Sequence, residues 1–244
     1  MGQALINVLN VLDFTVIPHF HEDGDISDKK TWKKLPIVDH VFHLAGPNFV
    51  PDSWNNPTEF IQTNVSSTNL ALNYCKLNCA HLIYISAYLY GIPKKLPINE
   101  NHPIFPNNPY ALSKHLSEKL CEFYSSYYNI AVTVIRPFNI FGPGQRSEFL
   151  IPKLIKQILD SNEVRAKDFS PKRDYIYIED FVDALVKVLG ISDNFQVINI
   201  GSGKSYSVRE IIDIIQEEAE TKLPVFSDQE VRENEIDNVC ADIH

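Results

Sequence analysis

The sequence predicts an α/β fold in which a parallel, doubly wound sheet carries helices on both faces. Mostly apolar runs of strand length alternate along the chain with longer segments in which apolar residues recur at helical spacing. The run 38–45 is followed by Gly46, and the run 80–85 is followed by Ser86. Strands that alternate with helices favour parallel pairing, because each helix returns the chain to the same end of the sheet.

The first elements precede the run 38–45. Apolar residues at helical spacing predict a helix over residues 2–13, and the apolar run 14–17 predicts a strand. Residues 24–28 are typical of a short strand and turn, after which Asp28 can cap a helix that reaches Leu35. Four further elements follow, namely a helix over 57–77, the strand 80–85, a helix over 110–128 and a strand over 132–136.

Beyond residue 142 the pattern changes. The expected elements are a helix within 146–161, a strand over 174–178, a helix over 180–190, a strand over 196–200 and a helix over 207–221. Ser207 and Glu210 have the spacing of a capping box, which marks the start of the last of these helices.

Three polar residues indicate proton-transfer chemistry. Tyr110 and Lys114 are spaced i, i+4, so they share one face of the helix that Asn108 and Pro109 begin. A Lys ammonium in this position can stabilise the phenolate and lower its pKa from about 10, and such a phenol can exchange a proton with an alcohol or a ketone. Ser86 ends a strand, where ligands bind in open α/β sheets. An exposed Tyr with its ring covered by Lys is the alternative interpretation.

The composition excludes several classes of protein. The net charge of −9 argues against a nucleic-acid partner. The sequence contains no run of 18 apolar residues, so it predicts no membrane span. The N-terminus lacks the basic region of a signal peptide. The cysteines at positions 75, 79, 121 and 240 form no disulfide or metal pattern. We therefore expect a cytoplasmic protein.

These motifs resemble the extended short-chain dehydrogenase/reductases, and among them the NAD-dependent nucleotide-sugar epimerase/dehydratase family of the UDP-glucose 4-epimerase type. The matching segments are His43 to Gly46, Asn64-Val65, Ser86 with Tyr90-Gly91, Pro109 to Lys114, Arg136 to Pro143, Arg173 to Asp180 and Asn199 to Gly203. The resemblance covers nearly the whole chain and implies a Rossmann-type sheet with a small C-terminal substrate domain. It implies residues 1–142 with 174–201 for the dinucleotide-binding domain, and 143–173 with 202–244 for the substrate-binding domain.

The resemblance also implies roles for individual residues. Tyr110 is implied as the catalytic acid/base, Lys114 as the group that tunes it, and Ser86 as the hydrogen-bond partner of the reacting oxygen. The implied cofactor is NAD, with NADP as the alternative. Its implied binding residues are Gly2, Asp25, Ile26, Leu44, Ala45, Gly46, Asn64, Tyr110, Lys114 and Pro137. A nucleotide-diphosphate sugar is the implied substrate, bound by Ser86, Asn139, Arg146, Arg173 and Arg232.

Some of these assignments have a simpler alternative. Asn64 is also explained as a structural residue that contacts backbone, and Arg173 and Arg232 as solvated surface side chains. His43 is better explained as a core group than as a catalyst, and His115 as a surface residue.

The sequence departs from the family pattern at both ends. The family opens with a strand and a Gly-xx-Gly-xx-Gly loop, of which only Gly2 has a counterpart, and it continues the helix that begins near Asp242. We therefore expect a chain truncated at both ends, whose sheet lacks its first strand and most of the glycine-rich loop. That strand is central in the order 3-2-1-4-5-6, so its neighbours would lack backbone partners.

Ala87 and Tyr88 distinguish between reactions within the family. Sugar 4,6-dehydratases carry an Asp-Glu pair at these positions, so dehydration is disfavoured here, and a 4-epimerase, a 4-ketoreductase or a decarboxylase remains. We expect a 4-epimerase first and a 4-ketoreductase second. A different class of function, a non-catalytic remnant or nucleotide-binding partner, follows from the incomplete glycine loop. The family further implies a homodimer formed through the helices at 57–77 and 110–128.

Overall fold

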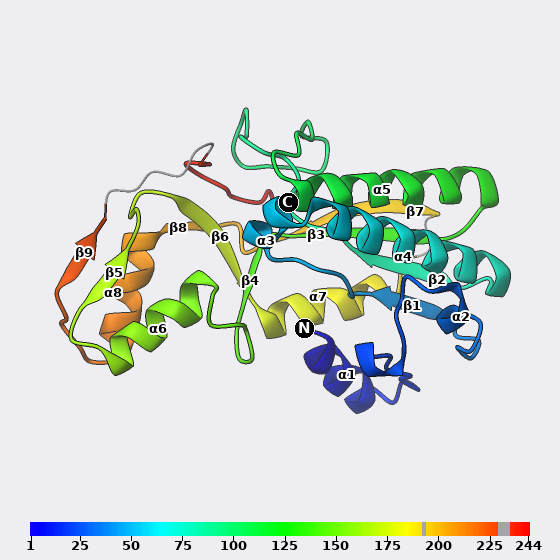
Figure 1. Cartoon of the computed structure of the whole chain (residues 1–244), viewed down its shortest axis with the longest axis horizontal. Helices are drawn as coiled ribbons and strands as arrows, with labels where there is room; N and C mark the ends of the chain where they lie inside the picture. Colours follow the sequence, from blue (N-terminus) through cyan, green and yellow to red (C-terminus); the bar gives the residue numbers. More distant parts are fainter. Residues whose placement is uncertain (192–193, 229–234) are drawn as a thin grey trace. The chain divides into compact units, whose positions relative to one another are not determined.

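The computed structural model describes residues 1–191, 194–228 and 235–244 (Figure 1). The chain divides into two compact units. The first unit comprises Met1–Gly91, Pro103–Pro137 and Glu179–Ile200, and the second comprises Ile92–His102, Phe138–Ile178 and Gly201–His244.

A parallel four-stranded sheet forms the centre of the first unit. Its order is β1-β2-β3-β7, with β1 at His40–His43, β2 at His81–Ile85, β3 at Val132–Pro137 and β7 at Phe195–Ile200. Every neighbouring pair runs parallel, and β2 and β3 are buried along their whole length. The α/β fold with a Rossmann-type parallel sheet is confirmed.

Two long helices pack side by side against this sheet (Figure 1). α4 spans Pro57–Asn78, and α5 spans Pro109–Tyr128. The expected start of α5 is confirmed, because the Asn108 side chain accepts a hydrogen bond from the Ala111 N–H and Pro109 occupies the first turn. α7 (Ile178–Val188) supplies further fully buried side chains, Phe181, Val182 and Leu185.

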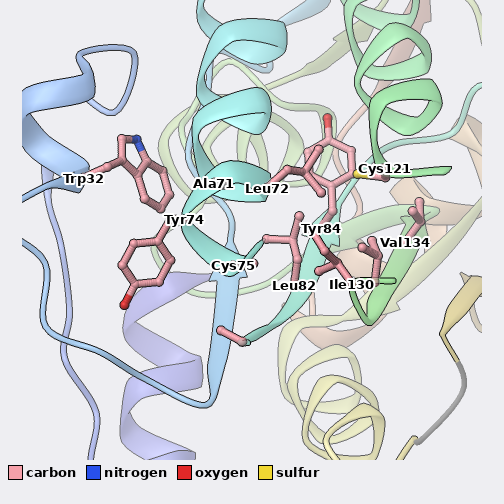
Figure 2. Packing of buried hydrophobic residues seen from close by; sticks show 12 residues of the cluster. Trp32, Ala71, Leu72, Tyr74, Cys75, Leu82, Tyr84, Cys121, Ile130 and Val134 are labelled. Carbon is pink, nitrogen blue, oxygen red and sulfur yellow. The ribbon is translucent and has the colours of Figure 1, made fainter. Parts of the chain in front are cut away.

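The core of the first unit lies where α4 and α5 meet the strands. Figure 2 shows Leu72 and Cys75 of α4 and Cys121 of α5 beside Leu82 and Tyr84 of β2. All five are buried. The buried side of α5 carries mostly small side chains, which allow it to pack closely against α4 and β3 and so hold the predicted catalytic turn at the sheet.

The N-terminal region differs from the sequence-based expectation. α1 spans Gly2–Val11 as expected, but the predicted strand at 14–17 is wrong, because residues 14–20 form no regular structure. Phe14 is 45% and Ile17 is 47% exposed. An extended segment becomes a strand only when a neighbour satisfies its backbone groups, and no described strand pairs with the outer edge of β1.

The segment that follows is also less regular than expected. No strand forms at 24–28; the short helices η1 (His21–Asp23) and α2 (Lys29–Trp32) flank a turn instead. Asp28 caps α2 as expected, by accepting from the Lys30 N–H at 2.8 Å. The helix α3 (Val50–Asn55) was not predicted.

The second unit combines short strands with two amphipathic helices. β4 (Asn139–Phe141), β6 (Lys172–Tyr177) and β8 (Ser205–Ser207) form one sheet, and β5 (Val164–Ala166) pairs with β9 (Val225–Ser227). α6 (Leu150–Asp160) and α8 (Val208–Glu218) pack together over a core that includes Leu154 and Ile212. The predicted capping box of α8 is confirmed, since Ser207 and Glu210 exchange both hydrogen bonds. No helix in the described part of the chain is long and apolar enough to cross a bilayer.

Candidate active site

Ser86 lies at the carboxyl end of β2, in the middle of the sheet. Its backbone N–H donates to the Ile135 carbonyl at 2.8 Å, so the position of the residue is set by the neighbouring strand β3. The side chain is buried, and its Oγ has no hydrogen-bond partner among the described residues. Buried hydroxyls are rarely left unpaired, so this oxygen is suited to bind a ligand atom.

Lys114 is held at the same strand end. Its side chain is 5% exposed, and its Nζ donates to the carbonyl of Ile85, the residue before Ser86, at 2.9 Å. The Nζ also lies 5.0 Å from the centroid of the Tyr84 ring. Burial lowers the pKa of Lys114 to about 8, while the negative charge of Glu118 acts in the opposite direction. The structure therefore places Ser86 and Lys114 together.

Tyr110 lies one turn before Lys114 on the same face of α5. Its half-buried ring contacts Phe60 edge-on, with 6.2 Å between centroids, and packs beside Ala87 and Leu89. Burial raises the pKa of Tyr110 above its ordinary value, the opposite direction to the one expected from the Lys114 charge. The reason is that the ammonium donates to a backbone carbonyl, while the phenol is packed among apolar side chains.

The predicted cofactor residues around Gly46 come together in the structure. A Cβ added at Gly46, where φ is +143°, would lie 2.2 Å from the Asn64 Oδ1. Asn64 is buried and donates to the Ser113 Oγ of α5 at 2.8 Å, so it joins the loop after β1 to both long helices. Its Oδ1 has no partner within the described residues. Asn64 thus has the structural role considered for it and also a free acceptor.

The other cofactor-side residues are more dispersed. Gly2 lies close to Leu44, since a Cβ on it would be 3.8 Å from the Leu44 Cδ1, and Ala45 is exposed. Pro137 ends β3 opposite Ile200. Asp25 and Ile26, the other two predicted cofactor residues, lie in the turn before α2. The exposed Asp25 carboxylate accepts hydrogen bonds from Ser27, and the Ile26 carbonyl accepts one from the Trp32 ring.

The predicted substrate residues beyond Ser86 belong to the second unit. Asn139 donates to the Asp174 carbonyl at 3.0 Å, and Arg146 is an exposed side chain paired with Glu148 at 3.5 Å. Arg173 is ion-paired with Glu235 and donates to the Ile236 carbonyl. Arg232 lies outside the described residues. Of the two described arginines in this set, Arg173 is therefore the one held by several contacts.

Two histidines near the motifs have different environments. His43 is buried, its Nε2 is 3.1 Å from the Ser67 Oγ, and burial lowers its pKa to about 3, as expected for a neutral core group. His115 is half-buried, in contrast to the surface position expected for it. No cluster of three or more metal-ligating side chains occurs within the described ranges.

Sequence reasoning assigned no role to Glu118, which forms a buried ion pair with Arg136 one helical turn beyond Lys114. The available signal was its spacing, because Tyr110, Lys114 and Glu118 recur at intervals of four residues.

Comparison with known proteins gives consistent matches. A model described as the NAD dependent epimerase/dehydratase family matches residues 2–201. A GDP-6-deoxy-D-mannose reductase from Pseudomonas aeruginosa is 33% identical over 226 residues, with 87% of this chain and 73% of that protein covered. A UDP-glucose 4-epimerase from Lactobacillus helveticus is 30% identical over 217 residues, with 78% of this chain and 65% of that protein covered.

A solved structure matches closely as well. RMD from Pseudomonas aeruginosa, complexed with NADPH, superposes with a TM-score of 0.90 at 28% identity and covers 99% of this chain and 85% of its own. Ser86, Tyr110 and Lys114 all fall within the residues that the family model matches.

Proposed function

The chain belongs to the NAD-dependent epimerase/dehydratase family, and we propose that it is a nucleotide-sugar 4-epimerase. One observation carries this proposal. The Ser86 Oγ is buried and has no hydrogen-bond partner among the described residues. The carbonyl of the preceding residue anchors Lys114, and Tyr110 lies one turn from Lys114 on α5. This arrangement suits a hydroxyl or carbonyl oxygen that changes its protonation state.

The residues present fit a nicotinamide cofactor. The Asn64 Oδ1 has no hydrogen-bond partner among the described residues, so it remains an acceptor for a ligand group after β1, while Gly46 lets the loop pack closely against Asn64. We propose that Gly2, Leu44, Ala45, Gly46, Asn64 and Pro137 hold NAD, together with Lys114. When bound, the nicotinamide would accept a hydride from the sugar and return it.

The protein side of the reaction is proton transfer at the sugar oxygen. Tyr110 receives the hydroxyl proton as the alcohol is oxidised and gives it back on reduction, while the Ser86 hydroxyl holds the reacting oxygen. The Lys114 ammonium, one turn from the phenol, favours the phenolate, which is the form that accepts the hydroxyl proton. Because burial raises the pKa of Tyr110, the resting residue is the neutral phenol; it must lose its proton to solvent before it can accept one from the alcohol, and it is already in the form that protonates the keto-sugar.

We propose a nucleotide-diphosphate sugar as the substrate. Arg173 has the planar fork that suits diphosphate oxygens, and it is already ordered by Glu235. Asn139, Arg146 and Arg232 complete the proposed set. Replacing Arg173 with Gln should raise KM for the sugar nucleotide with a smaller effect on kcat, which steady-state kinetics would measure.

A second candidate is a one-way 4-ketoreductase. It is favoured by the relative named GDP-6-deoxy-D-mannose reductase and by the similar solved structure that contains NADPH. An epimerase returns the hydride to the same sugar and ends each turnover with its cofactor oxidised, whereas a reductase consumes one reduced cofactor per product.

The test combines binding and turnover. The purified chain is titrated with NAD⁺, NADH and NADPH, and is then given UDP- and GDP-hexoses or their 4-keto derivatives, with product analysis by chromatography. Interconversion of 4-epimers without net change in nicotinamide absorbance supports the epimerase. Stoichiometric loss of NADPH with a 4-keto-sugar supports the reductase. Failure to bind any dinucleotide would reject both and leave the non-catalytic alternative.

We also propose a homodimer formed through α4 and α5. α5 carries the exposed aromatic side chains Phe123, Tyr127 and Tyr128, and Phe123 and Tyr127 stack with 4.7 Å between their centroids. Leu77 at the end of α4 is 73% exposed. Exposed apolar groups gathered on one helix are typical of a surface that another protein covers.

A further inference from the structure

A buried ion pair lies one helical turn beyond Lys114. The Arg136 Nε donates to the Glu118 Oε1 at 3.0 Å, and its Nη2 donates to the Oε2 at 2.6 Å. Both side chains are 5% exposed. The two-point contact fixes the rotation of the carboxylate as well as its position.

Two further residues complete the network. The Arg136 Nη1 donates to the Tyr90 Oη at 2.9 Å, and the Tyr90 Oη donates to the Asn199 Oδ1 at 2.6 Å. Arg136 is in β3, Asn199 in β7, Tyr90 follows β2, and Glu118 is on α5. The network therefore joins β3, β7 and the segment that follows β2 to the helix that carries Tyr110 and Lys114.

Stability alone is a poor explanation for this network. Desolvation of two charges offsets most of their attraction, and apolar residues of similar volume often replace a buried pair without loss. The position of the pair suggests a different role, because Glu118 is at i+4 from Lys114 and faces the same side of α5.

The charges around Lys114 are few. From β1 and β2 the neighbouring titratable groups are His43 and Tyr84, and from α5 they are Tyr110, Glu118 and Cys121. Burial keeps His43, Tyr84 and Cys121 in their neutral forms at pH 7, since it lowers the pKa of the first and raises those of the other two. Glu118 is the carboxylate of this group.

We propose that Glu118 is a positioning residue that keeps the Lys114 ammonium charged at the end of β2, and that Arg136, Tyr90 and Asn199 hold its carboxylate in place for this purpose. The proposal rests on the proposed function, in which the charged form of Lys114 assists Tyr110. The Arg136 guanidinium fixes the carboxylate by a planar fork, so Glu118 presents its charge from a set location to a lysine whose charged form is disfavoured by burial.

The test measures Lys114 directly and needs no turnover. The chain is prepared with lysines labelled at Cε and Nζ, the Lys114 resonance is assigned by its loss in Lys114→Met, and its pKa is followed by NMR. In Glu118→Gln the pKa of Lys114 should fall by about one unit, because a carboxylate near an ammonium typically raises its pKa by that order. Glu122→Gln is the matched control: this exposed carboxylate on the same helix pairs with Lys119, and its loss should leave Lys114 unchanged.

A second variant covers the case in which the single variant does not fold. Glu118→Gln leaves a buried guanidinium without its partner, whereas Glu118→Gln with Arg136→Met removes both charges and keeps the volume. A lower pKa of Lys114 in the double variant supports the proposal, and a pKa within a few tenths of wild type in either folded variant overturns it. If the chain turns over, the alkaline limb of its pH–rate profile should move to lower pH by the same amount. Absence of turnover with the expected NMR shift would reject the proposed function and leave the electrostatic coupling standing.

Discussion

Burial favours the neutral forms of both Lys114 and Tyr110, and it therefore shifts their pKa values in opposite directions. Removing an ammonium from water favours the neutral amine, and removing a phenol from water favours the neutral phenol. The pKa of Lys114 accordingly falls to about 8, and that of Tyr110 rises. At pH 7 the pair is therefore an ammonium one helical turn from a protonated phenol, the form that the proposed mechanism needs for proton donation to a ketone.

Replacing Tyr110 with Phe should abolish turnover while the fold is retained. Loss of a general acid/base removes about 10²- to 10⁴-fold in kcat, and the ring that contacts Phe60 is preserved. Steady-state kinetics and circular dichroism measure the two effects. Tyr127→Phe on the exposed part of α5 is the control, and its kcat should equal that of wild type. Undiminished activity in Tyr110→Phe would refute the mechanism.

Lys114 should also make stability depend on pH. Its pKa is about 8 in the folded chain and 10.5 when unperturbed, so between these values the unfolded chain binds more protons. Stability contributed by this group must then increase as pH rises through that window. The difference in free energy of unfolding between wild type and Lys114→Met, measured in urea at pH 7.5 and 10, should change in favour of wild type at the higher pH. A difference independent of pH would contradict the lowered pKa.

Among the elements, the loop after β1 and the helices α4 and α5 meet at Asn64. Its amide reaches the Ser113 hydroxyl of α5, and its Oδ1 occupies the space that a side chain at residue 46 would need. Gly46→Ala should lower the free energy of unfolding by about 1–3 kcal/mol, through this clash and the unfavourable φ. Chemical denaturation measures the change.

Gly144→Ala separates the two contributions to that loss. Gly144 also has a positive φ, +77°, but nothing lies within 4 Å of an added Cβ. It should therefore show only the backbone cost, which is smaller. Equal losses in the two variants would mean that the Asn64 contact is not tight.

The long elements were predictable from sequence and the short ones were not. β2 and β3 were expected at 80–85 and 132–136 and lie at His81–Ile85 and Val132–Pro137, because continuous apolar runs mark strands buried on both faces. The strands β4, β5, β8 and β9 have three residues each, too few to show a period.

The same contrast applies to the site. Ser86, Tyr110 and Lys114 are proposed from local spacing and flanking turn residues, and the structure brings Ser86 and Lys114 to the same strand end. The pairing of Glu118 with Arg136 depends on a contact between α5 and β3, which no local pattern specifies. The sequence likewise gave the Tyr110–Lys114 spacing but not the Ile85 carbonyl to which the ammonium donates.

At the scale of the whole molecule, assembly and cofactor binding can be tested together. If α4 and α5 form a homodimer interface, Tyr127→Glu should convert the dimer to a monomer in sedimentation velocity, since Tyr127 is 74% exposed in the single chain. Ile37→Glu, at a residue 76% exposed elsewhere in the first unit, should leave the dimer intact. A wild-type chain that sediments as a monomer at all concentrations would reject the proposed interface.

Cofactor binding should raise the melting temperature. A ligand present at a hundred times its Kd stabilises the folded state by about 2.7 kcal/mol, so a thermal melt with excess NAD⁺ should shift upward by several degrees. Gly46→Ala should reduce that shift along with the basal stability if the loop after β1 contacts the dinucleotide. An unchanged melting temperature with every nicotinamide cofactor would mean that this chain does not bind one.

The order β1-β2-β3-β7 has a consequence for the rate at which amide hydrogens near the site exchange with solvent. Amide hydrogens of β2 and β3 are enclosed by strands on either side, whereas β1 and β7 each have one neighbour among the described strands. Deuterium should therefore enter β1 and β7 first, through openings that leave the central strands protected. The carbonyl that holds Lys114 belongs to β2, and Ser86 is the residue after this strand. Local opening at the edges of the sheet can therefore occur while the proposed catalytic residues keep their arrangement.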